Sequence, residues 1–111
     1  MEYVTIDVPV RLWHLVDGAV DNSMALDVVD AIMLTVLAGA CVRDAGWRAA
    51  AESPGPRDQY GWPPPDHPLR IVLRREHWGW VLVQLSRWHS AGDAEAAGAV
   101  TELIEAGLRV P

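Results

Sequence analysis

The sequence has 111 residues but no lysine, no phenylalanine and only one cysteine, Cys41. A single cysteine excludes an internal disulfide framework and a zinc finger built on cysteine ligands. The first twenty residues carry acidic side chains and lack the apolar segment of a secretory signal. The longest apolar run, Val28–Val42, is interrupted by Asp30 and Thr35 and is too short to span a bilayer. We therefore expect a soluble protein of the cytoplasm that does not associate with membranes.

Half of the residues are hydrophobic and 22% are charged, a balance typical of a folded chain rather than a disordered one. The length fits one domain. All nine basic residues are arginine, which together with frequent alanine, glycine and proline indicates a GC-rich genome. The net charge of −6 is uneven: Met1–Glu52 holds three arginines and eight acidic residues, a net charge of −5, whereas the chain from Leu69 onward is neutral.

The first part of the chain predicts one strand followed by two helices. Tyr3–Val8 alternates strictly between apolar and polar side chains, which is typical of a half-buried strand. Pro9 ends this strand and suits the entry to a helix from Val10 to about Asp21. A polar break at residues 21–23, in which Asn22 or Ser23 can serve as a cap, begins a second helix that reaches about residue 42.

The same pattern recurs near the end of the chain. Leu69–Arg74 alternates like the first strand, Glu76–Trp88 has the spacing of an amphipathic helix, Ser90–Gly92 predicts a turn, and Asp93–Leu108 predicts a final helix. We therefore expect two strand–helix–helix units.

Two alignments support an internal duplication. Ile6–Trp13 aligns with Ile71–Trp78 at an offset of 65 residues, and Val28–Gly39 aligns with Ala96–Gly107 at an offset of 68 residues. The expected organisation is a single domain, 1–111. It consists of a first βαα unit at 1–43, a proline-rich crossover at 44–68 and a second βαα unit at 69–111.

The crossover holds six of the eight prolines, so it cannot form a helix or a central strand. We expect an extended connector over the surface, held to the body by Trp47, Tyr60 and Trp62. Proline-rich stretches can also be ligands for aromatic-lined grooves, although connectors are the commoner case.

A short strand, a proline and two helices resemble the ribbon-helix-helix family. The residues that carry the resemblance are Val4–Asp17 and Val28–Ile32; it covers Met1–Val42 well and Leu69–Val110 more loosely. In that family two chains pair their strands, and four helices enclose one core. The resemblance implies an α+β fold in which both units of this chain form a two-stranded antiparallel ribbon packed on four helices. One strand and two helices cannot bury their apolar faces alone, which agrees with this pairing.

Members of this family read DNA with the exposed face of the ribbon. By position, the nucleic-acid-binding residues here would be Tyr3, Thr5, Asp7, Arg70, Val72 and Arg74. Their charge is unfavourable, because Asp7 would face phosphates. The expected second helices also begin with acids, at positions where the family binds phosphate: Asp27 and Asp30, and Asp93 and Glu95. The acidic first unit cannot neutralise phosphates, so DNA binding is the alternative rather than the leading hypothesis.

No motif in the chain indicates catalysis. The histidines His14, His67, His77 and His89 lack metal-ligand spacing, and no glycine loop, nucleophile elbow or carboxylate pair is present. We interpret His14 and Asp17 as a surface pair, and Cys41 as a small core residue. We expect no metal, no cofactor and no enzymatic activity.

The helix Glu76–Trp88 carries a candidate partner-binding patch. Five side chains form one core-facing stripe: Trp78, Val81, Leu82, Leu85 and Trp88. Trp80 and Val83 fall nearer the opposite face, beside Arg87, a composition typical of interfaces. Either this face binds a partner together with Trp62, or the crossover covers Trp80 with Trp62.

The run Val28–Val42 is apolar nearly all round. Such a helix is either the central core helix or half of a homodimer interface, and the resemblance favours the core.

The sequence therefore favours a non-enzymatic protein-interaction module, either a monomeric pseudo-dimer or a homodimer. In size and composition it is similar to small accessory proteins of actinobacteria and their phages, which implies a host protein as partner. The alternative is a ribbon-helix-helix DNA-binding transcriptional regulator of the antitoxin kind.

Overall fold

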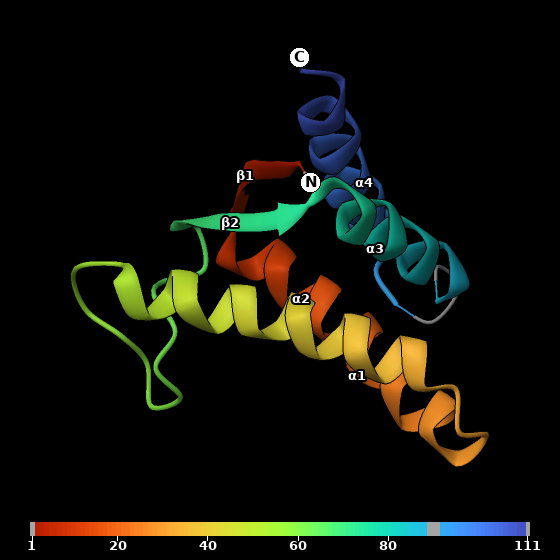
Figure 1. Ribbon diagram of the computed structural model, residues 1–111. Helices are drawn as coiled ribbons and strands as arrows, with labels where there is room; N and C mark the ends of the chain where they lie inside the picture. Colours follow the sequence, from red (N-terminus) through yellow and green to blue (C-terminus); the bar gives the residue numbers. More distant parts are fainter. Residues whose placement is uncertain (1, 89–91, 111) are drawn as a thin grey trace.

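The computed structural model describes residues 2–88 and 92–110, which form two strands and four helices (Figure 1). Their order along the described chain is strand, helix, helix, strand, helix, helix. The elements are β1 (Tyr3–Pro9), α1 (Val10–Val29), α2 (Met33–Glu52), β2 (Pro68–Arg74), α3 (Arg75–Arg87) and α4 (Ala94–Arg109). The expected α+β class is confirmed.

The two strands pair in antiparallel fashion, with Ile6 directly opposite Ile71 at the centre of the ribbon. Because side chains alternate along a strand, one face of the ribbon is buried and the other is exposed. Both alternations agree with the sequence pattern. The inward face consists of Val4, Ile6 and Val8 from β1 and Leu69, Ile71 and Leu73 from β2.

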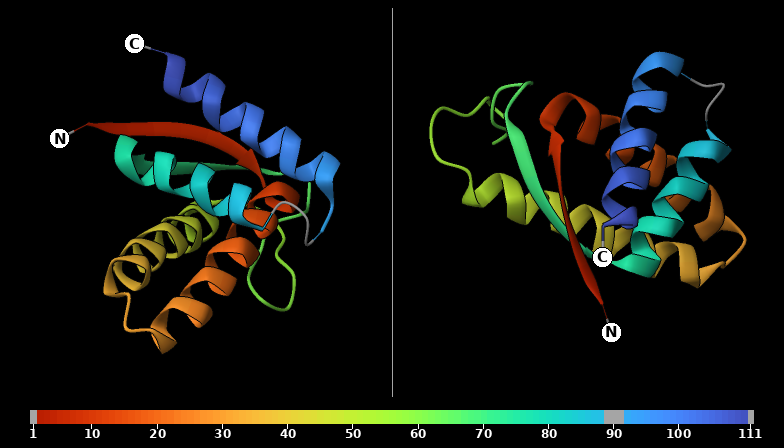
Figure 2. Two further views of the ribbon diagram at one scale, coloured as in Figure 1. Left: turned by 90° about the vertical axis from the view of Figure 1, so that its right-hand side faces the viewer. Right: turned by 90° about the horizontal axis from the view of Figure 1, so that it is seen from above.

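The helices enclose the inward face of the ribbon, and each half of the chain packs on the other. Helix α2 contacts β2, whereas α4 contacts β1 and lies beside it in Figure 2. At the centre of the core Trp13 meets Trp78 edge to face, with 6.4 Å between ring centroids. The indole N–H of Trp78 donates to the carbonyl of Val4 at 2.9 Å, so the buried donor of Trp78 is satisfied.

The expected helix break at residues 21–23 is wrong, because α1 continues to Val29. Ser23 does not cap a helix; its hydroxyl is buried and donates to Gln84 Oε1 at 2.6 Å. Ser23, which the sequence suggested as a helix cap, thus forms its hydrogen bond with a side chain of α3 instead. The turn to α2 lies instead at residues 30–32, where Ala31 has a φ of 56°.

This shift overturns the second alignment. An offset of 68 residues matches Val28 and Val29, which end α1, with residues inside α4. It also moves the crossover, because α2 extends to Glu52 and the connector is therefore residues 53–67 rather than 44–68. Of the expected turn Ser90–Gly92, the first two residues lie outside the described residues. The final helix begins as expected, with Asp93 accepting a hydrogen bond from the backbone N–H of Ala96 at 3.1 Å.

The connector is organised by its own side chains. Arg57 donates to carbonyl oxygens of Ala50, Ala51 and Ser53 and so satisfies the C-terminal end of α2. Asp58 accepts from the backbone N–H groups of Trp62 at 2.9 Å and Tyr60 at 2.8 Å.

Those hydrogen bonds hold the pKa of the Asp58 carboxyl below its usual value, the bond from Trp62 having the largest effect. Trp62 is buried and packs on Trp47 of α2 with 4.6 Å between ring centroids, so it holds the connector to the body, as expected of it from the sequence. Tyr60 does not hold the connector in place, since it is 71% exposed.

Candidate protein-interaction surface

The α1–α2 hairpin is longer than the α3–α4 hairpin and projects beyond the core. Helix α1 has 20 residues and α3 has 13, so α1 is about two turns, or roughly 10 Å, longer. In Figures 1 and 2 the turn between α1 and α2 projects away from the ribbon and from α4. We call this projecting part, residues 26–37, the overhang.

The overhang carries a dense group of exposed apolar side chains. Val29 and Leu34 are each 80% exposed, and Asp30 is the one charged side chain of the overhang outside the buried Asp27. Isolated exposed apolar residues are ordinary, whereas a group of them is a common feature of interaction sites. The large apolar side chains exposed on the overhang are Leu26, Val28, Val29, Ile32, Met33, Leu34 and Leu37.

The expectation that Val28–Val42 is the central core helix is therefore wrong. Helix α2 packs on α1 through small side chains, among them Gly39 against Met24 and Gly46 against the Trp13 indole. That narrow contact leaves the larger side chains of α2 on its outer faces. Cys41, expected in the core, is exposed for the same reason.

Polar contacts fix the base of the overhang to α3. The guanidinium of Arg87 donates two hydrogen bonds of 2.9 Å to the carboxylate of Asp27, and Thr35 donates a third at 2.8 Å. These bonds, that of Arg87 first, hold the pKa of Asp27 below its usual value. Beside them, the indole N–H of Trp88 donates to the hydroxyl of Ser23 at 2.8 Å. Arg87 of α3 thus binds the α1 arm of the overhang, and Thr35 joins the α2 arm to the same carboxylate.

The patch predicted on α3 does not form as expected. Arg87 is engaged by Asp27 and lies over the Trp88 ring at 5.5 Å, so it belongs to the base of the overhang. Val83 is 61% exposed, whereas Trp80 is partly buried against the core. Trp62 lies in the connector, which Figure 1 places on the side of the molecule opposite α3, so it neither covers Trp80 nor joins its surface.

A groove of about 670 Å³ runs between α2 and the ribbon and is continuous with the overhang through Leu34 and Leu37. The α2 wall is apolar in its first half and charged near its end, where Arg48 pairs with Asp44 at 2.6 Å. The opposite wall includes Val72, Arg74 and His77.

The exposed face of the ribbon brings together all six residues of the DNA-binding alternative. Tyr3 lies opposite Arg74, Thr5 opposite Val72, and Asp7 opposite Arg70. Arg74 also pairs with Glu76 at 3.4 Å; hydrogen bonds to Tyr3 and Glu76 raise the pKa of its guanidinium. Each arginine of this face therefore has an acidic neighbour.

The acids expected at the start of the second helix are not there. Asp27 lies in the last turn of α1, Asp30 lies in the turn, and the first turn of α2 carries no acid. Glu95 does lie in the first turn of α4, as predicted.

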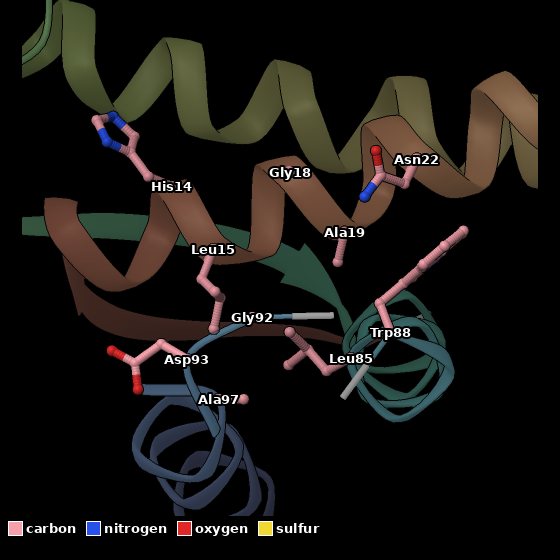
Figure 3. A pocket seen from close by; sticks show the side chains of 10 residues that line it. All are labelled: His14, Leu15, Gly18, Ala19, Asn22, Leu85, Trp88, Gly92, Asp93 and Ala97. Atoms are coloured by element: carbon pink, nitrogen blue, oxygen red, sulfur yellow. The ribbon is translucent and has the colours of Figure 1, made fainter. Parts of the chain in front are cut away.

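A cavity of about 480 Å³ lies between α1 and the connector and is lined by His14, Arg57 and Asp58 among others. A pocket of about 200 Å³ lies between α1, α3 and α4, and Figure 3 shows His14 pointing away from Asp93 there. His14 packs edge-on against Trp62, and Asp17 binds Arg43 at 3.0 Å, so the expected pairing of His14 with Asp17 is wrong. Among the residues that the structure describes, no group of three or more His, Cys, Asp or Glu side chains could hold a metal ion.

Within residues 2–88 and 92–110, none of the helices combines the length and the hydropathy of a membrane-spanning segment.

Comparison with protein-family models, curated proteins and solved structures finds no match to this chain. The overhang is thus identified by its geometry alone. A signal for it was present in the sequence, since Val28–Val42 holds one charged residue in fifteen, and a dimer interface was one of its two interpretations.

Proposed function

We propose that this chain is a non-enzymatic protein-interaction module whose docking surface is the overhang. The observation that carries the proposal is the group of seven large apolar side chains, each between 45% and 80% exposed, on a hairpin that projects from the core. The polar contacts of Asp27 and Arg87 hold this surface in one orientation, which lowers the entropic cost of binding a partner.

The scaffold that presents the overhang is, in our proposal, a ribbon-helix-helix-like pseudo-dimer made by internal duplication. Residues matched by the offset of 65 meet at the centre of the molecule: Ile6 pairs with Ile71, and Trp13 packs on Trp78. Two equivalent residues lie opposite each other in this way when they sit on a two-fold axis. The contacts of α2 with β2 and of α4 with β1 have the same symmetry.

Photo-cross-linking in the native host tests the docking surface. A photoreactive phenylalanine analogue replaces Leu37 in one variant and Tyr60 in a matched control, because both side chains are exposed and Tyr60 lies in the connector. We expect a discrete cross-linked protein band from position 37 and none from position 60. The band should disappear when Val29→Glu is added. Absence of any band from position 37 would contradict the proposal.

DNA binding is the second candidate, favoured by the grouping of Thr5, Arg70 and Arg74 on one exposed face. The carboxylates of Asp7 and Glu76 beside these arginines oppose it, as does the acidic first half of the chain. Titration of labelled duplex at low and moderate salt decides between the candidates. Tight binding that weakens steeply with salt, and is lost in Arg70→Ala, would replace the protein-interaction proposal.

A further inference from the structure

We infer that the occupant of the overhang is a second copy of this chain, bound through a two-fold contact centred on the first half of α2. This inference rests on the proposed function and names its partner. The alternative position for the apolar run, inside the core, is excluded by the exposure of Val29, Leu34 and Leu37.

The exposed apolar area of the overhang approaches that of a standard-size interface. Taking about 100 Å² for a fully exposed aliphatic side chain, the seven exposed side chains of the overhang present roughly 400 Å². A standard interface buries about 800 Å² per partner. In homodimers about 65% of the interface is apolar, which corresponds to about 500 Å². The overhang supplies most of that area before the walls of the neighbouring groove are included.

The composition of the surface also fits self-association. A partner recognised by charge would need an array of one sign, whereas the overhang exposes Asp30 as its one charged side chain. A surface that is apolar and nearly uncharged is typical of homodimer interfaces, whose cores are depleted in charged residues.

The spacing of the exposed apolar side chains along α2 favours one arrangement of the two copies. Leu34, Leu37 and Cys41 follow the spacing of three and four residues that brings side chains to one seam of paired helices. The same seam continues into Asp44 and Arg48, which are charged. Antiparallel packing centred near Leu37 joins the two uncharged halves and separates each Asp44 from the Asp44 of the other copy. Parallel packing would place Asp44 against its own copy, which is unfavourable.

The affinity of this dimer should depend on the salt concentration. Each chain carries a net charge of −6, so two copies repel each other over long range. Because the buried contact is apolar, added sodium chloride screens the repulsion and removes no attraction. We therefore expect the dimer to strengthen as ionic strength rises, whereas a complex held by opposite charges would weaken.

Sedimentation velocity on the purified full chain tests the inference, over a range of protein concentration and at two salt concentrations. We expect a species with twice the mass of one chain. Leu34→Glu should weaken the dimer by at least about a hundredfold, since each copy would bury an unpaired carboxylate. Leu34 is 80% exposed, so the variant should keep the circular dichroism of the native fold. Val83→Glu is the matched control, because Val83 is 61% exposed and lies outside the overhang.

The outcomes separate the two proposals. A wild-type chain that stays monomeric at all concentrations overturns the second copy as occupant; the docking proposal then stands if position 37 cross-links to a different protein in the host, and falls if it cross-links to none. A dimer that Leu34→Glu leaves intact is held by another surface and also overturns the inference. A dimer lost in Leu34→Glu and kept in Val83→Glu supports it.

Discussion

Arg87 binds both carboxylate oxygens of Asp27 at 2.9 Å and thereby ties the end of α3 to the end of α1. The two residues are sixty positions apart in the sequence, and each had a different expected role, Arg87 in binding a partner and Asp27 in opening a helix. Their pairing decides the orientation of the overhang, because Thr35 of α2 donates to the same carboxylate.

Removing this carboxylate should lower stability in a way that depends on pH. Hydrogen bonds from Arg87 and Thr35 hold the pKa of Asp27 below its usual value, so the ionised form is favoured in the folded state. Its contribution to stability is present above the unfolded pKa of about 3.9 and is lost as the pH falls through the folded pKa. We expect Asp27→Asn to unfold at lower denaturant concentration than wild type at neutral pH, and the difference to shrink below about pH 4.

Asp30→Asn is the control for this experiment, because Asp30 is an exposed acid in the adjoining turn. Denaturant midpoints of both variants and of wild type across the pH range give the comparison. A deficit of Asp27→Asn that is the same at acidic and neutral pH would show that the charge of Asp27 is not what stabilises the pair.

Gly46 should not tolerate alanine. A Cβ at this position would meet the buried indole of Trp13, whose surroundings are filled by the core. Alanine in a helix normally stabilises by about 1 kcal/mol relative to glycine, but forced overpacking costs about 1–3 kcal/mol. We expect a net loss of up to about 2 kcal/mol in the free energy of unfolding.

Gly98→Ala provides the matched comparison, since a Cβ on Gly98 of α4 has no neighbouring atom within 4 Å. This variant should gain about 0.5–1 kcal/mol from helix propensity alone. Chemical denaturation of the two variants in parallel measures both effects. Equal gains in both would mean that α2 can move away from Trp13 without loss.

Trp62→Ala should detach the connector. The Trp62 ring is buried, stacks on Trp47 and meets His14, and its deletion from a packed site is expected to cost about 3 kcal/mol. Tyr60→Ala, two residues away and highly exposed, should change stability by less than about 0.5 kcal/mol. Limited proteolysis of the connector should become faster in the first variant and not in the second. Similar cleavage of both would place the anchoring elsewhere.

The strands were predictable from the sequence because their signal is local. The alternation of Tyr3–Val8 and of Leu69–Arg74 sets which side chains face inward, whereas the register that places Ile6 opposite Ile71 comes from the structure. Pro9 marked the end of the first strand and the start of a helix, within one residue of the observed boundary. The exposure of the proposed partner-binding residues was less well predicted, because Arg87, Trp62 and Trp80 each make an intramolecular contact.

The sequence by itself determined the α+β class, the pairing of two similar strands and the six side chains on the exposed ribbon face. Only the tertiary structure decided where α1 ends and which side chains of Val28–Val42 are exposed. Residues 21–23 resemble a helix break, but Ser23 forms a buried hydrogen bond with Gln84 and α1 continues through them. The contact of α2 with α1 through Gly39 and Gly46 then turned the large apolar side chains outward. A local pattern can show that a helix is apolar all round, but which face is buried depends on a partner distant in the chain.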